Sequence, residues 1–468
     1  MTVLGNLVNN QPGGIILKSP ENSGASGSLI VNGGVSGTGT ITAERHIAAA
    51  NWGINQEGFH LISSPVAAEE ISGEWTPTGE GNDYDFYGWS ESAQTWVNKK
   101  NTDPEDPPIW TVYHPETYFK IGQGYLVAYQ TLATKTFSGE MNTGNQSVTL
   151  KLSGTPAVNN SYGYNLIGNP FASALDWAHA SWGTANNNYG GVAKIWSNGA
   201  YVDVVTSNPV NNDVTVIPAM NGFFVYTVAD NNTFTIPAAA QTHSIDNWHK
   251  STNNSAIKLS VKGKNSSLKQ EISIRFNSEA TSGFDLAFDS YFMAGYAPIF
   301  YSVSEEKNYS TNTLPSYDSE TVIPFVFIKN EYEEFDLELT SSIEGQQVFL
   351  TDNKTGIIHK LSENPVYTFT SEEGDSPDRF LLHFGVVGIG EQDQATTLNA
   401  YAYNNRLYVN NSLEQAQIAV YDLQGRLLMQ QSASTSGLQS LPLDLPAGVY
   451  VVRLSNAQEA KSVKINVQ

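Results

Sequence analysis

The chain has 468 residues and no cysteine, and its 46 acidic and 24 basic side chains give a net charge of −22. The length suggests about three domains, and the missing cysteines exclude disulfides, thiol nucleophiles and cysteine-based zinc sites. The acidic excess disfavours nucleic acid and anionic membranes as partners. No run approaches the ~18 apolar residues of a membrane span, and helical periodicity is almost absent, so the sequence predicts an all-β protein.

The first residues lack the basic region and apolar stretch of a secretory signal peptide. Short apolar runs separated by Asn and Gly follow, at residues 15–18 and 28–34. Such runs are typical of the last rungs of a β-solenoid, in which each strand stacks on an equivalent strand one turn away. We therefore expect residues 1–40 to form a solenoid end or N-terminal strands, and the chain to be the C-terminal part of a longer protein.

Residues 41–250 form a Trp-rich region, because all nine tryptophans lie between Trp52 and Trp248. A linker-like stretch rich in Ser, Asn and Thr follows at residues 250–255. We expect a domain boundary there.

The Trp-rich region contains an internal duplication. Four landmarks recur in the same order: residues 58–66 match 163–171, residues 86–89 match 193–196, residues 121–129 match 219–226, and residues 135–139 match 232–236. We infer two related units, about 58–140 and 163–238. They form either two β-sheets packed against each other or two sandwiches side by side.

Aromatic side chains are the best candidates for ligand contacts, because the flat faces of sugars stack on Trp and Tyr. Trp89 and Trp196 are equivalent in the two units, so we expect them to be structural. Four tryptophans have no evident counterpart and are the candidate glycan contacts: Trp75, Trp96, Trp110 and Trp182. The alternative is that these four also belong to the core.

Two loop-like stretches carry clustered oxygen ligands, which a hard cation such as calcium requires. The candidates are Asp83 and Asp85 in the first stretch and Asp103 and Asp106 in the second. Neither stretch matches an EF-hand loop, so plain loop acidity is the alternative. There is no Gly-x-Ser-x-Gly elbow and no histidine pair with zinc-protease spacing. The sequence therefore predicts no catalytic residues, and no cofactor unless calcium is bound.

Residues 255–385 contain alternating apolar and polar runs, such as 257–261 and 271–276, with a turn at 352–356. Strands at such short spacing predict a β-sandwich. A second linker is expected at 386–397. The predicted fold class is thus tandem β-sandwich modules of jelly-roll or immunoglobulin-like type, preceded either by the end of a β-solenoid or by N-terminal strands.

The last stretch, residues 398–468, carries four acidic and five basic residues, unlike the acidic body. Ile418 and Val420 alternate with polar neighbours, and residues 422–425 have turn chemistry. Tyr450, Val452 and Leu454 fall on one face of a later strand. These features predict a small immunoglobulin-like β-sandwich.

This stretch resembles the C-terminal sorting domain (type A) of cargo of the type IX secretion system of Bacteroidetes. The residues that carry the resemblance are Tyr421, Asp422, Gly425, Arg426, Gly448, Tyr450, Lys461 and Lys464. A generic immunoglobulin-like module is the alternative. The resemblance implies binding to the type IX machinery, export across the outer membrane, and surface attachment or release.

The rest of the chain leaves two hypotheses open. In the first, non-catalytic scaffold or adhesin-like modules are displayed on the cell surface and contact a host or cell-surface ligand. In the second, the chain is a carbohydrate-binding accessory region of a polysaccharide-degrading enzyme whose catalytic part lies outside it. The first is preferred, so the chain itself is not expected to be an enzyme.

Overall fold

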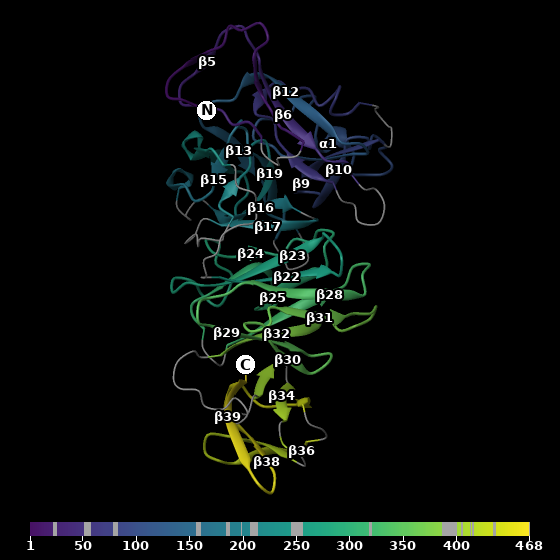
Figure 1. Ribbon diagram of the computed structural model, residues 1–468, viewed down its shortest axis with the longest axis vertical. Coiled ribbons are helices and arrows are strands. Elements are labelled where there is room, and N and C mark those ends of the chain that lie inside the picture. Colours follow the sequence, from purple (N-terminus) through teal and green to yellow (C-terminus); the bar gives the residue numbers. More distant parts are fainter. Residues whose placement is uncertain are drawn as a thin grey trace.

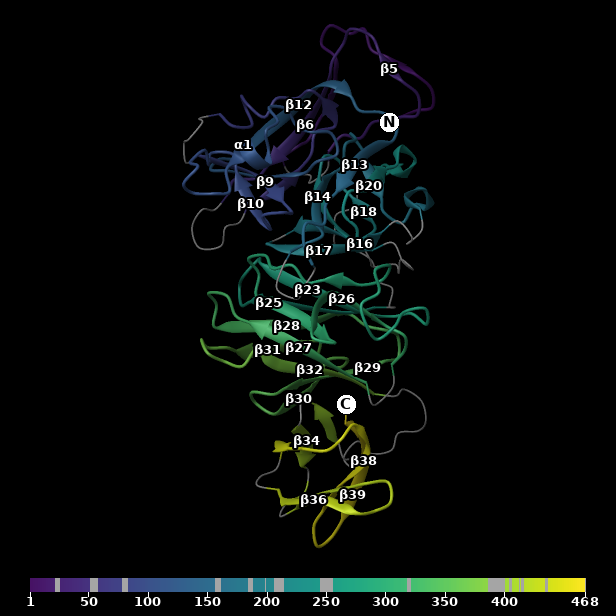
Figure 2. The same cartoon turned by 180° about the vertical axis from the view of Figure 1, so that it is seen from behind.

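The protein is described here by a computed structural model, and almost all of its regular structure is β-strand, which confirms the all-β prediction. The structure describes residues 1–21, 26–50, 58–77, 83–155, 161–183, 188–197, 199–205, 214–244, 256–317, 321–385, 400–403, 406–411, 413, 416–433 and 437–467. Helix in these ranges is limited to α1 (Trp110–Tyr113) and the 3-10 turns η1 (Ala180–Trp182) and η2 (Ala238–Ala240). Both expected linkers, 250–255 and 386–397, lie outside the described residues. Figures 1 and 2 show an elongated molecule along which the chain runs from one end to the other.

The N-terminal strands pair in parallel with strands one turn later in the chain. These strands are β1 (Thr2–Val3), β2 (Leu7–Val8), β3 (Ile15–Leu17), β4 (Ile30–Val31), β5 (Val35–Ser36) and β6 (Ile41–Ile47). Thr2 lies opposite Ile30, Leu7 opposite Val35 and Ile15 opposite Ile41, which are steps of 28, 28 and 26 residues. A nearly constant step between parallel strands is the geometry of one solenoid rung on the next.

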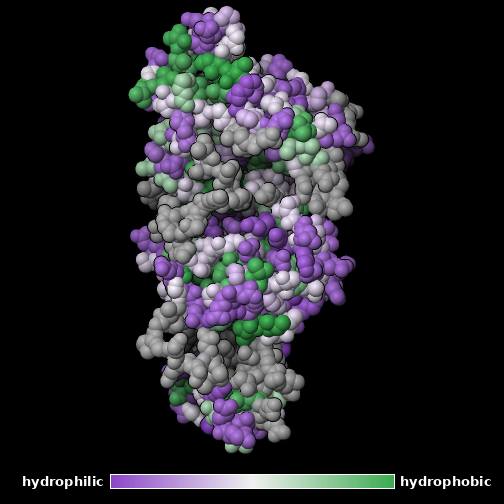
Figure 3. All heavy atoms as spheres, viewed as in Figure 1, coloured by the Kyte–Doolittle hydropathy of each residue, from purple (hydrophilic) through white to green (hydrophobic). Residues whose placement is uncertain are grey.

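This end of the molecule is also apolar at its surface. Figure 3 shows hydrophobic side chains gathered where Figure 1 places β5. The large hydrophobic side chains exposed in the first rung are Met1, Leu4, Val8 and Ile16.

The two duplicated units have four-stranded sheets with the same strand order. The first sheet runs β10 (Thr95–Asn98), β9 (Tyr84–Ser90), β11 (Tyr125–Tyr129), β7 (His60–Ile62). The second runs β17 (Ala200–Val205), β16 (Tyr189–Ser197), β19 (Gly222–Thr227), β14 (Tyr164–Gly168). The sequence match pairs β7, β9 and β11 with β14, β16 and β19, which hold the same places in the second order, as expected for a duplication. Strands β10 and β17 correspond by their place in the sheets.

Each four-stranded sheet covers a core of its own. In the first unit the facing strands are β3, β6, β8 (Val66–Ala67) and β12 (Ala133–Met141), which form one sheet. In the second they are β13 (Gln146–Leu150) with β20 (Asn232–Ile236), and β15 (Ala174–Asp176) with β18 (Val216–Ile217) and β21 (Gln241–Thr242). A further cluster, including Leu61, Leu126, Leu166 and Phe224, joins the outer faces of the two four-stranded sheets. The units are therefore two sandwiches that pack sheet against sheet.

Residues 256–385 form one eleven-stranded sheet. Its strands are β22 (Ala256–Gly263), β23 (Lys269–Phe276), β24 (Ser290–Tyr291), β25 (Ile299–Ser304), β26 (Lys307–Leu314), β27 (Val322–Ile328), β28 (Glu334–Ser341), β29 (Gln347–Asp352), β30 (Ile357–Lys360), β31 (Val366–Thr370) and β32 (Asp378–Gly385). The sheet curls, so that Tyr367 on β31 donates a hydrogen bond to Asp352 on β29, 2.9 Å away, across its two ends. The apolar core lies between the two halves, as in a sandwich.

The tail is a small sandwich of two sheets. One contains β33 (Ala400–Tyr403), β34 (Arg406–Asn411) and β37 (Gly437–Pro442), and the other has the order β36 (Leu427–Ser432), β35 (Gln417–Tyr421), β38 (Gly448–Ser455), β39 (Ala460–Val467). Ile418, Val420, Val452 and Leu454 are fully buried between the sheets. The alternation seen in the sequence thus places these side chains in the core.

Candidate functional site

The turn between β35 and β36 is held by one carboxylate. Asp422 Oδ1 accepts hydrogen bonds from the backbone N–H groups of Gln424 (3.0 Å) and Arg426 (2.8 Å), and Arg426 Nε donates to Oδ2 at 2.5 Å. The backbone bond from Arg426, followed by its side chain, lowers the pKa of Asp422. Gly425 has a φ of +80°, a conformation that L-residues with a Cβ rarely adopt. The Asp-x-x-Gly-Arg pattern therefore fixes a single turn geometry.

Residues far apart in the tail sequence share one row across the sheet. Leu427 lies opposite Tyr421, Tyr421 opposite Val451, and Val451 opposite Lys464. Side chains in such a row point to the same face of a sheet. Leu427 and Lys464 are exposed and the other two are half-buried, so this face is open to solvent. Two of the predicted motif residues, Tyr421 and Lys464, are brought together in this way.

The remaining motif residues have structural roles or lie apart from this row. Tyr450 is buried and its hydroxyl donates to the Pro446 carbonyl at 2.8 Å. Gly448 begins β38 opposite Val467, and Lys461 is half-buried opposite Leu454 on β39. The motif is therefore divided between core, turn and surface.

Three of the four tryptophans predicted as glycan contacts lie in the core, so that prediction is wrong for them. Trp75 is fully buried and stacks on Phe137 at 4.4 Å, while Trp110 and Trp182 are 2% and 6% exposed. Trp96 is half-buried and packs edge-on against Trp89. The sequence argument failed because a tryptophan without a counterpart in the other unit shows only that the two units differ there. It does not show whether that tryptophan lies in the core or on the surface.

The calcium candidates do not converge on one point. Asp85 pairs with Lys100 at 3.0 Å, and Asp103 accepts a hydrogen bond from the Glu105 backbone at 2.9 Å. Asp106 is exposed and Asp83 is half-buried. Within the described ranges no three His, Asp or Glu side chains gather to hold a metal ion. Calcium binding stays a prediction.

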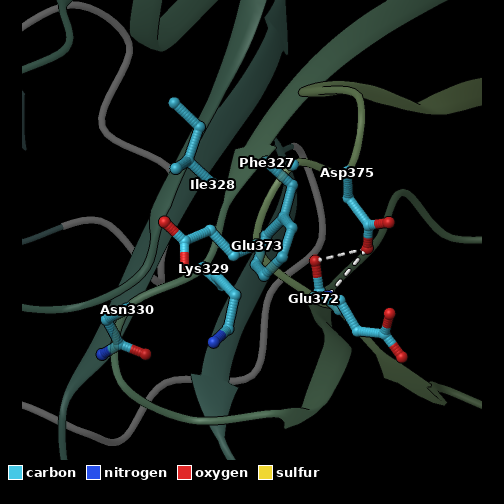
Figure 4. A pocket seen from close by; sticks show the side chains of 9 residues that line it. Phe327, Ile328, Lys329, Asn330, Glu372, Glu373 and Asp375 are labelled. Carbon is cyan, nitrogen blue, oxygen red and sulfur yellow. Dashed lines mark hydrogen bonds between the residues drawn. The ribbon is translucent and has the colours of Figure 1, made fainter.

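A hollow of about 350 Å³ lies between the end of β27 and the loop at residues 371–375. Figure 4 shows Lys329 and Asn330 on one side and Glu372 and Asp375 on the other. Asp375 is already held by Lys354 at 2.7 Å, and this hydrogen bond contributes most to lowering its pKa to about 2. The carboxylate serves to fix the loop.

A buried polar cluster joins the duplicated region to the eleven-stranded sheet, and sequence reasoning missed it. Lys194 on β16 donates to Asp203 on β17 at 2.6 Å and to Ser310 on β26 at 2.7 Å. Ser310 and Thr311 each donate to Asp203 Oδ2 at 2.7 Å. Burial lowers the pKa of Lys194. The available signal was a lysine in the middle of the apolar strand 192–196, which requires a buried partner.

Two family models match parts of this chain. A family model described as "Domain of unknown function (DUF8693)" matches residues 21–243 and 214–384, and one described as "Secretion system C-terminal sorting domain" matches residues 403–468. None of the curated proteins compared with the chain matches it. No described helix is long and apolar enough to cross a membrane.

Similarity to solved structures is weak. A "Biofilm associated protein - BSP domain" is 9% identical over 69% of this chain and 96% of its own, with a TM-score of 0.17. "The Bacillus anthracis TIE protein" is 10% identical over 74% of this chain and 53% of its own, with a TM-score of 0.11. These values carry no argument about function. The two DUF8693 matches together span more than half of the sequence, and the sorting-domain match agrees with the turn and strand motifs of the tail. The chain therefore belongs to the DUF8693 family, and it ends in a type IX C-terminal sorting domain, which directs it to the cell surface or the medium.

Proposed function

We propose that residues 21–384 are a non-enzymatic, adhesin-like scaffold that the sorting domain delivers to the cell surface. The observation that carries this proposal is the buried cluster of Lys194, Asp203 and Ser310. This cluster joins the two bodies of the scaffold, which are the duplicated region and the eleven-stranded sheet. Breaking a buried ion pair leaves an uncompensated charge, which is strongly destabilising. The bodies are therefore expected to move as one stiff unit, as a display stalk requires.

Backbone hydrogen bonds reinforce the same junction. Gly191 N–H donates to the Leu286 carbonyl at 2.9 Å, and Tyr296 N–H donates to the Gly199 carbonyl at 2.7 Å. The elongated arrangement in Figures 1 and 2 places the sorting domain at one end and the N-terminal rungs at the other. A stiff rod anchored at the sorting end would hold its far end away from the membrane.

The test compares two strains of a bacterium with a type IX system. One displays the full chain, and the other displays the sorting domain fused to an inert exported protein at equal surface density. We expect only the full chain to increase adhesion to host matrix or to neighbouring cells. Equal adhesion of both strains would overturn the scaffold proposal without affecting the sorting assignment.

A second candidate function is glycan recognition as an accessory region of a polysaccharide-degrading enzyme. It is favoured by a half-buried aromatic cluster at the junction, distinct from the buried tryptophans. Tyr296 is 36% exposed, and its ring centroid lies 6.0 Å from Phe59 and 5.7 Å from Trp196. Burial and then the negative charge of Asp85 raise the pKa of Tyr296. Aromatic rings beside a carboxylate provide the stacking and hydrogen bonding that a sugar needs.

Binding of the full chain to a panel of plant, algal and host polysaccharides, with and without calcium, tests this candidate. We expect saturable binding to one class of glycan, lost in Tyr296→Ala and Trp196→Ala. Tyr113→Ala, an exposed aromatic residue elsewhere, is the matched control. Binding that all three variants retain would exclude this cluster as the sugar site.

A further inference from the structure

Strand β36 is a free edge of the sorting domain. It is the first strand in the order β36-β35-β38-β39, and in the part of the chain that the structure describes no strand pairs with its outer side. Five of its six residues are exposed, and only Met429 is half-buried. Exposed edge strands carry unpaired N–H and C=O groups and are templates for pairing with another chain.

The hydrogen-bond pattern identifies which backbone groups face outward. Ala433 N–H donates to the Ala416 carbonyl at 2.8 Å, so these two residues form a hydrogen-bonded pair. Bonded and non-bonded pairs alternate along an antiparallel ladder. The register pairs Gln430 with Ala419 and Ser432 with Gln417, and both are non-bonded pairs. The N–H and C=O groups of Gln430 and Ser432 therefore point away from β35, toward the free side.

The start of the strand adds apolar surface to this edge. The register shifts between Val420 and Tyr421, where a bulge places Leu427 and Leu428 together opposite the partner strand. Leu427 is 49% exposed and Leu428 is 41% exposed. Leu423 in the preceding turn is 61% exposed, and the Asp422 bonds described above fix that turn. Three leucines are thus held at one edge by a rigid turn.

The charged side chains on the four strands of this sheet are positive. Arg453 on β38 and Lys464 on β39, the edge opposite β36, are exposed, and Arg426 in the turn is paired with Asp422. The scaffold, by contrast, is strongly acidic overall. Figures 1 and 2 place β36 at the end of the molecule away from the eleven-stranded sheet, where a large partner can approach it.

From these observations we propose that an extended, acidic and apolar segment of the type IX machinery adds as a strand to the outer edge of β36. Its backbone would bond to the outward groups of Gln430 and Ser432, its apolar side chains would cover Leu423, Leu427 and Leu428, and its acidic side chains would meet the cations. In such strand addition, backbone hydrogen bonds give affinity and side-chain pockets give specificity. The proposal rests on the sorting assignment and names the surface that the machinery reads.

The test uses the full chain expressed in a host with a type IX system, with the surface-exposed and periplasmic fractions measured by protease accessibility. Gln430→Pro removes one outward N–H and places a ring on the free edge, which an edge strand tolerates. Gln430→Ala loses the same side chain but keeps the N–H, so it is the matched control. We expect the surface fraction to fall about tenfold in Gln430→Pro, in line with the loss of a backbone bond together with neighbouring contacts, and to stay unchanged in Gln430→Ala.

A second pair of variants covers the possibility that proline unfolds the domain. Leu427→Lys with Leu428→Lys replaces exposed side chains only, and Ile357→Lys makes an equivalent change at a 48% exposed position in the scaffold. We expect export to fall for the double variant and not for Ile357→Lys, while both purified chains keep the wild-type unfolding midpoint.

The outcomes separate this proposal from the sorting assignment. Deleting residues 398–468 should trap the folded scaffold in the periplasm, and normal display of that truncation would contradict the assignment itself. If the deletion is trapped but Gln430→Pro and the double lysine variant are exported normally, the β36 proposal is overturned. It is also overturned if light scattering shows that the wild-type chain self-associates through β36 while both edge variants are monomeric and exported normally.

Discussion

Gly124 and Gly222, which are equivalent positions of the duplicated units, meet where the two units pack together. A Cβ on Gly222 would lie 3.5 Å from the Gly124 Cα. Around them the backbone bonds are reciprocal: Ser63 N–H donates to Met220 at 3.0 Å, and its equivalent Gly168 N–H donates to Gly122, the equivalent of Met220, at 2.8 Å. Equivalent residues therefore serve two purposes: they build the sheet within each unit, and they form the contact between the two units.

This contact predicts that alanine is poorly tolerated at Gly124. A Cβ there would lie 2.8 Å from both the Ile167 carbonyl oxygen and Leu166 Cγ, whereas one on Gly222 would lie 3.1 Å from Leu61 Cβ. Overpacking of this kind costs about 1–3 kcal/mol. We expect Gly124→Ala to lower the free energy of unfolding in urea by that amount and Gly222→Ala by less. Gly13→Ala, which has no neighbour within 4 Å, is the control, and an equal loss in all three would contradict the packing argument.

The junction between the two bodies predicts a large cost for removing one charge. Asp203→Ala leaves Lys194, whose side chain is 1% exposed, without its partner, and breaking a buried pair costs about 3–5 kcal/mol. The double variant Lys194→Met with Asp203→Ala should be less destabilised than Asp203→Ala alone. Glu363→Ala removes an exposed partner of Lys360 and should cost less than about 1 kcal/mol. A small effect of Asp203→Ala in chemical denaturation would show that the cluster does not hold the junction.

Trp75 is predicted to act on stability and not on ligand binding. It is fully buried, and its indole N–H donates to the Thr136 carbonyl at 3.2 Å. Trp75→Ala should destabilise the first unit by about 3–5 kcal/mol, as buried Trp-to-Ala changes do. Below its unfolding temperature the variant should bind any polysaccharide as the wild type does. A specific loss of glycan binding in the folded variant would contradict the burial.

Asp289 predicts a pH dependence in the eleven-stranded sheet. It is 2% exposed, and burial raises its pKa from 3.8 to about 7. Between these values the folded state holds a proton that the unfolded state has lost, so the free energy of unfolding falls as pH rises from about 4 to 7, by at most about 1.4 kcal/mol per pH unit. Asp289→Asn should remove this contribution. Urea unfolding at several pH values measures this dependence, with the exposed Glu363→Gln as the control. If the free energy of unfolding of Asp289→Asn changed with pH as steeply as that of the wild type, the prediction would be contradicted.

The turn of the sorting domain predicts a residue-specific effect at Gly425. A Cβ there has open space, so only the φ of +80° penalises other residues. Asn tolerates this conformation, whereas a β-branched residue does not. Gly425→Val should therefore lower both the stability of the tail and the surface fraction, and Gly425→Asn should stay close to wild type. Equal export of the two variants would mean that the machinery does not depend on this turn.

Much of the tail could be predicted from sequence because its determinants are local. Alternation at Ile418 and Val420 fixes the buried face, and Asp422 with Gly425 fixes the turn, each within a few residues. The order of landmarks also predicted the duplication, because equivalent strands fold alike when their patterns are alike.

The placement of side chains in space depended on the tertiary structure. Trp75 is indistinguishable from a surface platform in the sequence, and only the packing of two sheets buries it. Likewise, Lys194 and Ser310 are 116 residues apart, and nothing local indicates that they share a hydrogen bond. The row formed by Leu427, Tyr421, Val451 and Lys464 requires the register of four strands. The sequence by itself determined the strand content, the turns and the export address, because these rest on short-range periodicity and backbone preference. Long-range strand pairing, which local pattern does not encode, decided the rest. It formed the buried polar cluster around Lys194, buried the core tryptophans and left the edge of β36 free.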